Sequence, residues 1–198
     1  MLTRRQQGLT LIELIVGISI LAGLLAMGVP AFTAWIQDTQ VRTAAESILN
    51  GLQSARAEAV RRNTVVRFVL TDRDGQVSWT VGCATATADC PAKIQERQAA
   101  ESGTLAKVTV SDAQLPVPAP AGYFTAQISD AGELPAEVNF DALGRVFTPP
   151  AGAVFTRADV TSTASSTARR YVVVVGTGGQ IRMCDPKMAF ATDPRGCS

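Results

Sequence analysis

Residues 4–36 read RRQQGLTLIELIVGISILAGLLAMGVPAFTAWI. The 23 residues from Leu14 to Ile36 carry no charge. As an α-helix they would extend roughly 35 Å, which matches a bilayer hydrocarbon core of about 30 Å. Arg4 and Arg5 precede the apolar run, and Asp38 is the first charge after it. The positive-inside rule then places the N-terminus in the cytoplasm and the rest of the chain on the other side of the membrane.

A secretory signal is the alternative interpretation, because such a signal also begins with basic residues. Its apolar region is only about 7–15 residues long and ends at small residues. Here the apolar run continues past Pro30 and Trp35, which favours a membrane anchor. A cut near residues 26–28 stays the alternative.

Glu13 is an acidic residue at the start of this apolar helix. A carboxylate inside such a helix costs a few kcal/mol on insertion scales unless it meets a partner. Two explanations fit the residue alone: it reaches the lipid headgroups, or it faces a cation from another chain.

Residues Arg4-Arg5-Gln6-Gln7-Gly8 and Leu9-Thr10-Leu11-Ile12-Glu13 resemble the type III signal of type IV pilins and type II secretion pseudopilins. That signal is a short basic leader ending in Gly, followed by a Glu at the fifth position after the cut. The resemblance implies that a prepilin peptidase cuts between Gly8 and Leu9 and methylates the new amino group. Leu9 departs from the usual Phe at this position.

The same resemblance implies roles for two residues in a filament. Glu13 would pair with the N-terminal amine of a neighbouring subunit, which gives its carboxylate a cationic partner. Pro30 stands where the family usually has a helix-kinking proline, and a missing N–H is consistent with a bend there.

The whole chain has 198 residues, 46% of them apolar, and a formal net charge of +1. This composition favours about one globular domain. With 15 Arg, 3 Lys and no His, the chain lacks the imidazole of a His metal site or a Ser-His-Asp triad.

Three short patterns suggest chemistry, and each has a plainer explanation. Asp72-Arg73-Asp74-Gly75 resembles the start of a calcium loop but lacks the later ligands. Residues 176–179 are Gly-rich, yet no helix pattern or lysine of a phosphate-binding loop follows them. Glu137 and Asp141 alone do not define an active site. We therefore expect turns here, and no enzyme activity, cofactor or metal.

Beyond the apolar segment, apolar residues recur every three or four positions. They are Val41, Ala44, Ala45, Ile48, Leu49, Leu52, Ala55, Ala59 and Val60. This spacing predicts one helix from about Leu9 to Arg62 whose second half packs into a head domain. Two helices joined by a linker near Asp38 are the alternative.

After Asn63 the apolar period changes to two, which predicts strands. The predicted strands are Thr64–Leu70, Gln76–Val81, Ala106–Val110, Phe124–Ser129, Glu137–Phe140, Arg145–Phe147, Ala153–Thr156, Arg170–Val175 and Gln180–Cys184. Residues 71–75 read as a hairpin turn, and residues 115–122 and 161–167 as loops.

The fold class is therefore α+β, with a long N-terminal helix packed against a small antiparallel β-sheet head. We expect three regions: a leader at 1–8 that is removed, the membrane-spanning and assembly half of the helix at 9–36, and an exported head at 37–198.

Three segments near the C-terminus resemble the GspH/FimT family of minor pilins and pseudopilins: Val138–Arg145, Arg170–Val174 and Gly178–Arg182. With the N-terminal signal, the resemblance covers most of the chain, although about residues 83–135 contribute no segment to it. The family fold is a long N-terminal helix carrying a small head of antiparallel sheet, in agreement with the periodicity.

The four cysteines, Cys83, Cys90, Cys184 and Cys197, all follow the membrane segment, and none shows the close spacing of a zinc site. Disulfides are the default in an oxidising compartment. We favour Cys83–Cys90 and Cys184–Cys197, which close short loops and would each stabilise the head by about 3 kcal/mol. A crossed connectivity stays open.

Charge is distributed unevenly. Residues 157–198 hold six basic and three acidic side chains, whereas residues 9–156 hold 10 basic and 14 acidic ones. Some family members that serve DNA uptake carry Gly-Arg-x-Arg where this chain has Gly179-Gln180-Ile181-Arg182, so Gln180 replaces one arginine. The candidate DNA contacts are Arg182, Arg169, Arg170, Lys187 and Arg195. A solvated surface or a subunit interface is the favoured alternative.

Together, these features predict a minor pilin of a type IV pilus that enters the filament through its N-terminal helix and initiates or caps assembly. The alternatives are a minor pseudopilin of a type II secretion system and a DNA-binding minor pilin for natural transformation. Expected partners are other pilins or pseudopilins, prepilin peptidase and the inner membrane, with DNA less favoured. The expected location is a single-pass inner-membrane protein with a periplasmic head, later part of a pilus or pseudopilus.

Overall fold

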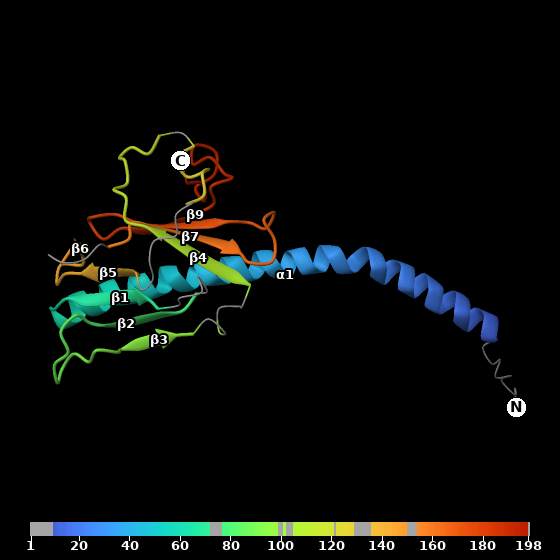
Figure 1. The fold of residues 1–198 in the computed structure, drawn as a ribbon, viewed down its shortest axis with the longest axis horizontal. Helices are drawn as coiled ribbons and strands as arrows, with labels where there is room; N and C mark the ends of the chain where they lie inside the picture. The colour runs from blue at the N-terminus through green and yellow to red at the C-terminus, as the bar shows by residue number, and fades with distance from the viewer. Residues whose placement is uncertain are drawn as a thin grey trace, which may run out of the picture. The chain divides into compact units, whose positions relative to one another are not determined.

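The computed structural model describes residues 10–71, 77–98, 101, 105–120, 122–128, 136–149 and 154–197. The chain forms two compact units, one ending at Ile36 and the other beginning at Gln37 (Figure 1). Helix α1, Leu11–Arg62, supplies the described part of the first unit and the first element of the second. We call the second unit the head.

The part of α1 that belongs to the head buries one face. Val41, Ala44, Ala45, Ile48, Leu52, Ala55 and Ala59, all predicted on this face, are fully buried. Val60 was predicted there and is instead 52% exposed, because it lies one position, about 100° of helix rotation, past Ala59. Ser47 and Gly51 complete the buried face, and Leu49 is only half-buried.

The helix ends through local backbone chemistry. Asn63 adopts a left-handed conformation with φ of 51°, and the Thr64 N–H donates to the Ala59 carbonyl at 3.2 Å. Such a residue after the last turn is a common helix stop. Arg61 and Arg62 occupy that last turn, where cations suit the helix dipole.

The head contains two antiparallel sheets. The first has five strands in the order β3-β2-β1-β5-β6. Its strands are β1 (Val66–Leu70), β2 (Trp79–Cys83), β3 (Gln95–Arg97), β5 (Ala136–Phe140) and β6 (Val146–Phe147). Strands β1 and β2 pair antiparallel, with Leu70 opposite Trp79, as the predicted hairpin requires. Of the predicted turn, residues 71–75, only Thr71 is described, and its N–H donates to the Ser78 carbonyl at 3.1 Å.

The second sheet has four strands in the order β4-β7-β8-β9. They are β4 (Ala106–Ser111), β7 (Arg157–Ser162), β8 (Tyr171–Val175) and β9 (Ile181–Cys184). All of its pairings are antiparallel. The α+β class with a long helix against antiparallel strands is therefore confirmed, with two sheets where one was expected.

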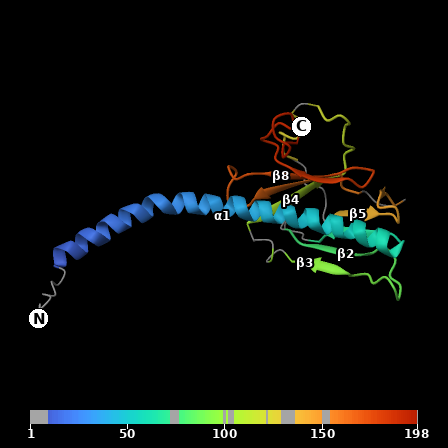
Figure 2. The same ribbon diagram turned by 180° about the vertical axis from the view of Figure 1, so that it is seen from behind.

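The main core lies between the head part of α1 and the strands, which Figure 2 shows behind the helix. Trp79 and Phe68 are among its largest fully buried side chains, and their ring centroids are 5.6 Å apart. The buried Trp79 Nε1–H donates to Ser47 Oγ at 2.8 Å. This bond ties β2 to α1 inside an apolar core, where an unpaired N–H would be costly.

Four differences separate the predicted strands from those in the structure. The segment predicted as Phe124–Ser129 forms turns and no strand over its described residues, 124–128. Over its described residues, 154–156, the segment predicted as Ala153–Thr156 has an isolated bridge from Val154 to Glu137 and no strand. Strands β3 and β7 were not predicted. Strand β7 also takes Thr161 and Ser162 from the expected loop at 161–167.

Candidate assembly site and head surface

Thr10 and Glu13 form the N-terminal cap of α1. The Thr10 backbone N–H and hydroxyl both donate to Glu13 Oε2, at 2.9 and 2.8 Å. The Glu13 N–H donates back to Thr10 Oγ1 at 3.4 Å. This reciprocal arrangement is a capping box, and the Thr-x-x-Glu spacing signals it in the sequence. Thr10 is absent from the predicted assembly residues, although that spacing could have identified it.

The other predicted residues of this segment are less defined. Gly8 and Leu9, the predicted processing residues, lie outside the described residues. Pro30 lies within α1, and its side chain is also outside the described part of the chain.

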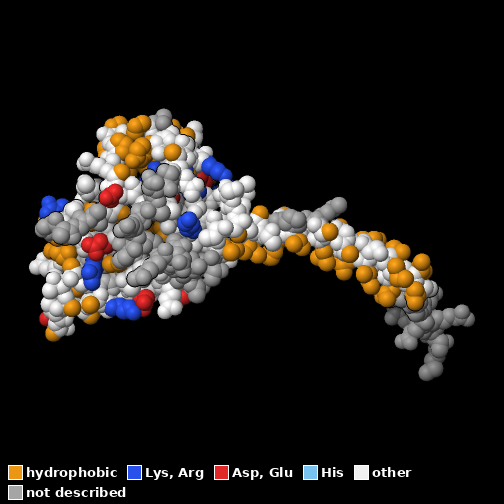
Figure 3. Space-filling model, viewed as in Figure 1, with side chains coloured by type: hydrophobic (Ala, Val, Ile, Leu, Met, Phe, Trp, Pro, Cys, Tyr) orange, Lys and Arg blue, Asp and Glu red, His pale blue; other side chains and the backbone are white. Residues whose placement is uncertain are grey.

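The first unit exposes a continuous apolar surface along α1, seen as orange side chains in Figure 3. Its large residues are half or more exposed: Leu11, Ile12, Leu14, Ile15, Val16, Ile18, Ile20, Leu21, Leu24, Leu25, Val29, Phe32 and Trp35. Ser19 donates its hydroxyl to the Ile15 carbonyl at 2.8 Å, so this polar group is satisfied within the helix. Among the described residues, α1 is the one helix long and apolar enough to cross a bilayer.

The cysteines form two disulfides in the head. Cys83 pairs with Cys90 and Cys184 with Cys197, at Cα–Cα distances of 5.8 and 4.9 Å. This is the short-loop connectivity favoured above. The second disulfide packs with Phe124 and Val172 in a small cluster separate from the main core. It thereby ties the C-terminal segment to the outer side of β8 and β9.

Arg170, a predicted DNA contact, is largely engaged inside the head. Its guanidinium forms an ion pair with Asp159 and donates to the carbonyls of Phe124, Thr125 and Ala126. Only 12% of its side chain is exposed. Its hydrogen-bonding groups are therefore directed into the protein.

The other four residues predicted to contact DNA differ in how far their side chains are bound by other groups of the head. The Arg182 guanidinium donates to the Gly196 carbonyl and lies 4.5 Å from the Phe190 ring centroid. Arg195 forms an exposed ion pair with Asp193 at 2.8 Å, and its hydrogen bonds lower the pKa of Asp193 to about 2. The Arg169 backbone N–H donates to Asp38 at 2.8 Å, and a hydrogen bond with Tyr171 raises the pKa of its guanidinium. The Lys187 side chain is exposed.

Two glycines, Gly144 and Gly179, lie where two turns of the head meet helix α1. Gly144 lies in the β5–β6 turn with φ of +72°, and its carbonyl accepts from Arg56 Nε of α1 at 3.0 Å. Gly179 lies in the β8–β9 turn with φ of +78°, and a Cβ there would stand 1.9 Å from the Gly144 carbonyl oxygen. The two turns therefore touch backbone to backbone, and Arg56 holds them against the helix.

No set of metal ligands comes together in the described part of the chain: it has no group of three or more His, Cys, Asp or Glu side chains placed to hold an ion.

The exposed apolar helix and the head of antiparallel sheets define a pilin-like protein. The family model described as type II transport protein GspH matches residues 44–179, and the model of the prokaryotic N-terminal methylation motif matches residues 3–29. The first match covers more than half of the chain, so the chain belongs to the GspH family of minor pilins and pseudopilins. Members of this family are structural proteins and not enzymes.

The solved structures that are similar to this chain include a type IV minor pilin and a minor pseudopilin. The type IV minor pilin FimU of Pseudomonas aeruginosa is 18% identical, with a TM-score of 0.48, over 78% of this chain and 96% of that chain. The minor pseudopilin EpsH of the Vibrio cholerae type 2 secretion system is 15% identical, with a TM-score of 0.47, over 75% and 99%. No curated protein matches the sequence.

Proposed function

We propose that this chain is a minor pilin of a type IV pilus. A prepilin peptidase cuts between Gly8 and Leu9 and methylates the new amine, and the first half of α1 then carries the subunit into the filament, where it initiates or caps assembly. The observation that carries the proposal is Glu13, a carboxylate in the first turn of a helix whose next 23 residues are uncharged.

The surroundings of Glu13 support this role. In the single subunit its carboxylate accepts hydrogen bonds from Thr10, which is uncharged. A neighbouring chain that begins at Leu9 would offer a cationic amine, the partner that a carboxylate in an apolar environment requires. The exposed apolar side chains of α1 would be covered by lipid before assembly and by other pilin helices afterwards.

A minor pseudopilin of a type II secretion system is the second candidate, because the matching family model describes a type II transport protein. The signal, the helix and the head are common to both systems. Either assignment places the subunit first in the inner membrane with its head in the periplasm, and its partners are other pilins or pseudopilins.

DNA binding for transformation stays a prediction. Arg170, Arg182 and Arg195 already have partners within the head, which leaves fewer free donors for phosphate than the sequence suggests. An Arg182→Ala variant that lowers a salt-dependent affinity for duplex DNA would support it.

A filament incorporation assay tests the proposed function. Glu13→Gln and a control on the same helix, Glu46→Gln, are expressed in the native host lacking the wild-type copy. Glu46 is exposed and pairs with Arg42. We expect Glu13→Gln to reach the membrane normally and to fall about tenfold or more in sheared filaments, since a buried pair has lost one partner. Glu46→Gln should be incorporated normally.

Equal incorporation of Glu13→Gln and wild type would overturn the assembly role. If wild-type protein is absent from sheared pili, and loss of the gene instead abolishes protein secretion, the pseudopilin assignment replaces the pilus assignment.

A further inference from the structure

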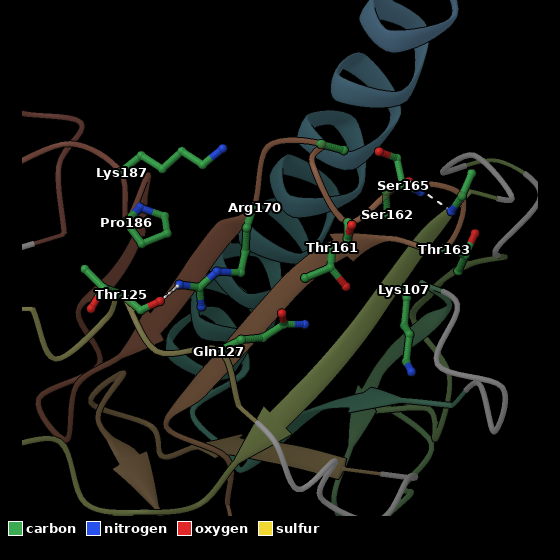
Figure 4. A pocket seen from close by; sticks show the side chains of 13 residues that line it. Lys107, Thr125, Gln127, Thr161, Ser162, Thr163, Ser165, Arg170, Pro186 and Lys187 are labelled. Atoms are coloured by element: carbon green, nitrogen blue, oxygen red, sulfur yellow. Dashed lines mark hydrogen bonds between the residues drawn. The ribbon is translucent and has the colours of Figure 1, made fainter.

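A polar groove of about 920 Å³ opens on the head beside strands β4 and β7, and three loops complete its lining, at 125–127, 163–170 and 186–187. Figure 4 shows Arg170 in its middle, with Lys187 on one side and Lys107 on the other. Most other lining residues are Ser and Thr, from residues 161–166 and from Thr125, and Gln127 adds an amide. Among the described residues that line the groove there is no carboxylate and no aromatic ring.

The distribution of lysine singles out this groove. The chain has three lysines, Lys93, Lys107 and Lys187, and two of them line it. Lys93 lies elsewhere and forms an ion pair with Glu96. Over the described part of the chain, neither Lys107 nor Lys187 has a carboxylate within ion-pairing distance. Within the described residues, both ammonium groups are exposed and have no carboxylate partner.

The buried charges beneath the groove are also positive in sum, like those of the two lysines at its edges. Arg157 and Arg170 share one carboxylate, Asp159, and the exposed fractions of these side chains are 8%, 12% and 0%. Arg157 binds it through two donors, at 2.8 and 2.9 Å. Among the described residues, these two buried cations share one buried anion, so one positive charge is not offset there, and such a charge is costly in a low-dielectric interior. An anion in the groove would offset that charge.

We propose that this groove binds an acidic saccharide, a sugar chain whose units carry carboxylate groups. The anionic groups would pair with Lys107 and Lys187, and the positive charge of Arg170 at the floor would attract them without a direct hydrogen bond. The hydroxyls of Thr161 and Ser166 and the amide of Gln127 would hydrogen-bond the sugar hydroxyls. Single-stranded nucleic acid fits less well, because its bases need aromatic side chains to stack on.

A binding measurement on the full processed chain in non-ionic detergent tests the proposal. The probes are oligogalacturonate, its neutral methyl ester, monomeric galacturonate, and a single-stranded DNA oligomer of the same charge. Wild type is compared with the double variant Lys107→Gln/Lys187→Gln and with Lys93→Gln as the matched control. All three lysine side chains are exposed, so these substitutions leave the fold intact.

We expect oligogalacturonate to bind and its methyl ester to bind at least about tenfold more weakly. The double variant should lose a similar factor, and Lys93→Gln should match wild type. Monomeric galacturonate should bind more weakly than the oligomer, and equally tight binding of the monomer would overturn the assignment of a sugar chain. Equal binding of acid and ester, an unchanged double variant, or DNA binding as tight as that of the oligosaccharide would overturn the proposal.

Discussion

Gly144 and Gly179 lie in the C-terminal segments that resemble the family, and each is needed for the close packing of its turn. Both have positive φ, and the Gly179 backbone packs so closely on the Gly144 carbonyl that no side chain fits between them. Arg56 then binds the same carbonyl from α1. The sequence shows two Gly-containing turns, but their mutual contact depends on the packing of two sheets, which local pattern does not reveal.

Gly179→Ala should therefore destabilise the head strongly. The new Cβ would meet the Gly144 oxygen at 1.9 Å, and Ala would be strained at φ of +78°. We expect a loss of about 2 kcal/mol or more in the free energy of unfolding. Gly178→Ala is the control, because its Cβ would meet only the end of the flexible Gln180 side chain, at 3.0 Å. Denaturant unfolding measures both, and equal stabilities would refute the proposed contact between the turns.

The head part of helix α1 could be predicted because its apolar residues recur every three or four positions, a pattern visible within a short stretch of sequence. Seven of the nine apolar residues predicted on this face are fully buried. Strand β7 was not predicted, because its buried positions include Arg157 and Asp159, which form an ion pair in the fold but interrupt the apolar pattern in the sequence. The strand predicted at 124–129 fails for a related reason. Its carbonyls at 124–126 accept from Arg157 and Arg170 in place of a neighbouring strand.

The bond between α1 and β2 makes a separate prediction. Ser47→Ala would leave the buried Trp79 N–H without an acceptor, at a cost of about 1–3 kcal/mol. Ser54→Ala on the same helix is the control, because it removes only an exposed hydrogen bond to Gln95. Both substitutions raise the helix propensity equally, but Ser54→Ala leaves no buried donor unpaired. Thermal unfolding of both variants should show a clear drop only for Ser47→Ala. A Ser47→Ala melting temperature equal to that of Ser54→Ala would mean that the bond contributes nothing.

Across the whole molecule, the broad fold could be predicted because three patterns follow one another along the chain. An uncharged apolar run comes first, then apolar residues at helical spacing, and then segments in which apolar residues alternate with polar ones. The groove lined by Lys107 and Lys187 did not follow, since its residues come from segments 80 positions apart and meet only through the order β4-β7-β8-β9. The candidate DNA contacts were chosen by charge alone. The structure shows that several of these arginines already hold the head together.

Acid should weaken the head through carboxylates on several elements. Hydrogen bonds from Arg145 lower the pKa of Asp141, those from Arg61 lower the pKa of Glu58, and those from Arg195 lower the pKa of Asp193 to about 2. A carboxylate whose pKa is lowered in the folded state stabilises the fold at pH values above its unfolded-state pKa of about 4. This stabilisation is lost as the pH falls through the folded-state pKa.

We therefore expect the melting temperature of the full chain in detergent to be level from pH 7 to about 5 and to fall between about pH 4 and 2. The Asp193→Asn variant should lose less stability over the lowest part of that range. A melting temperature that rises on acidification would contradict the assigned partners.

Processing as a pilin is tested most directly by the intact mass and N-terminal sequence of protein extracted from the native membrane. We expect a chain that begins at Leu9 and carries one added methyl group on its amine. A chain that begins at Met1 would be a membrane-anchored exported protein, and one that begins near Pro30 a secreted protein. Either result would contradict filament assembly through Glu13.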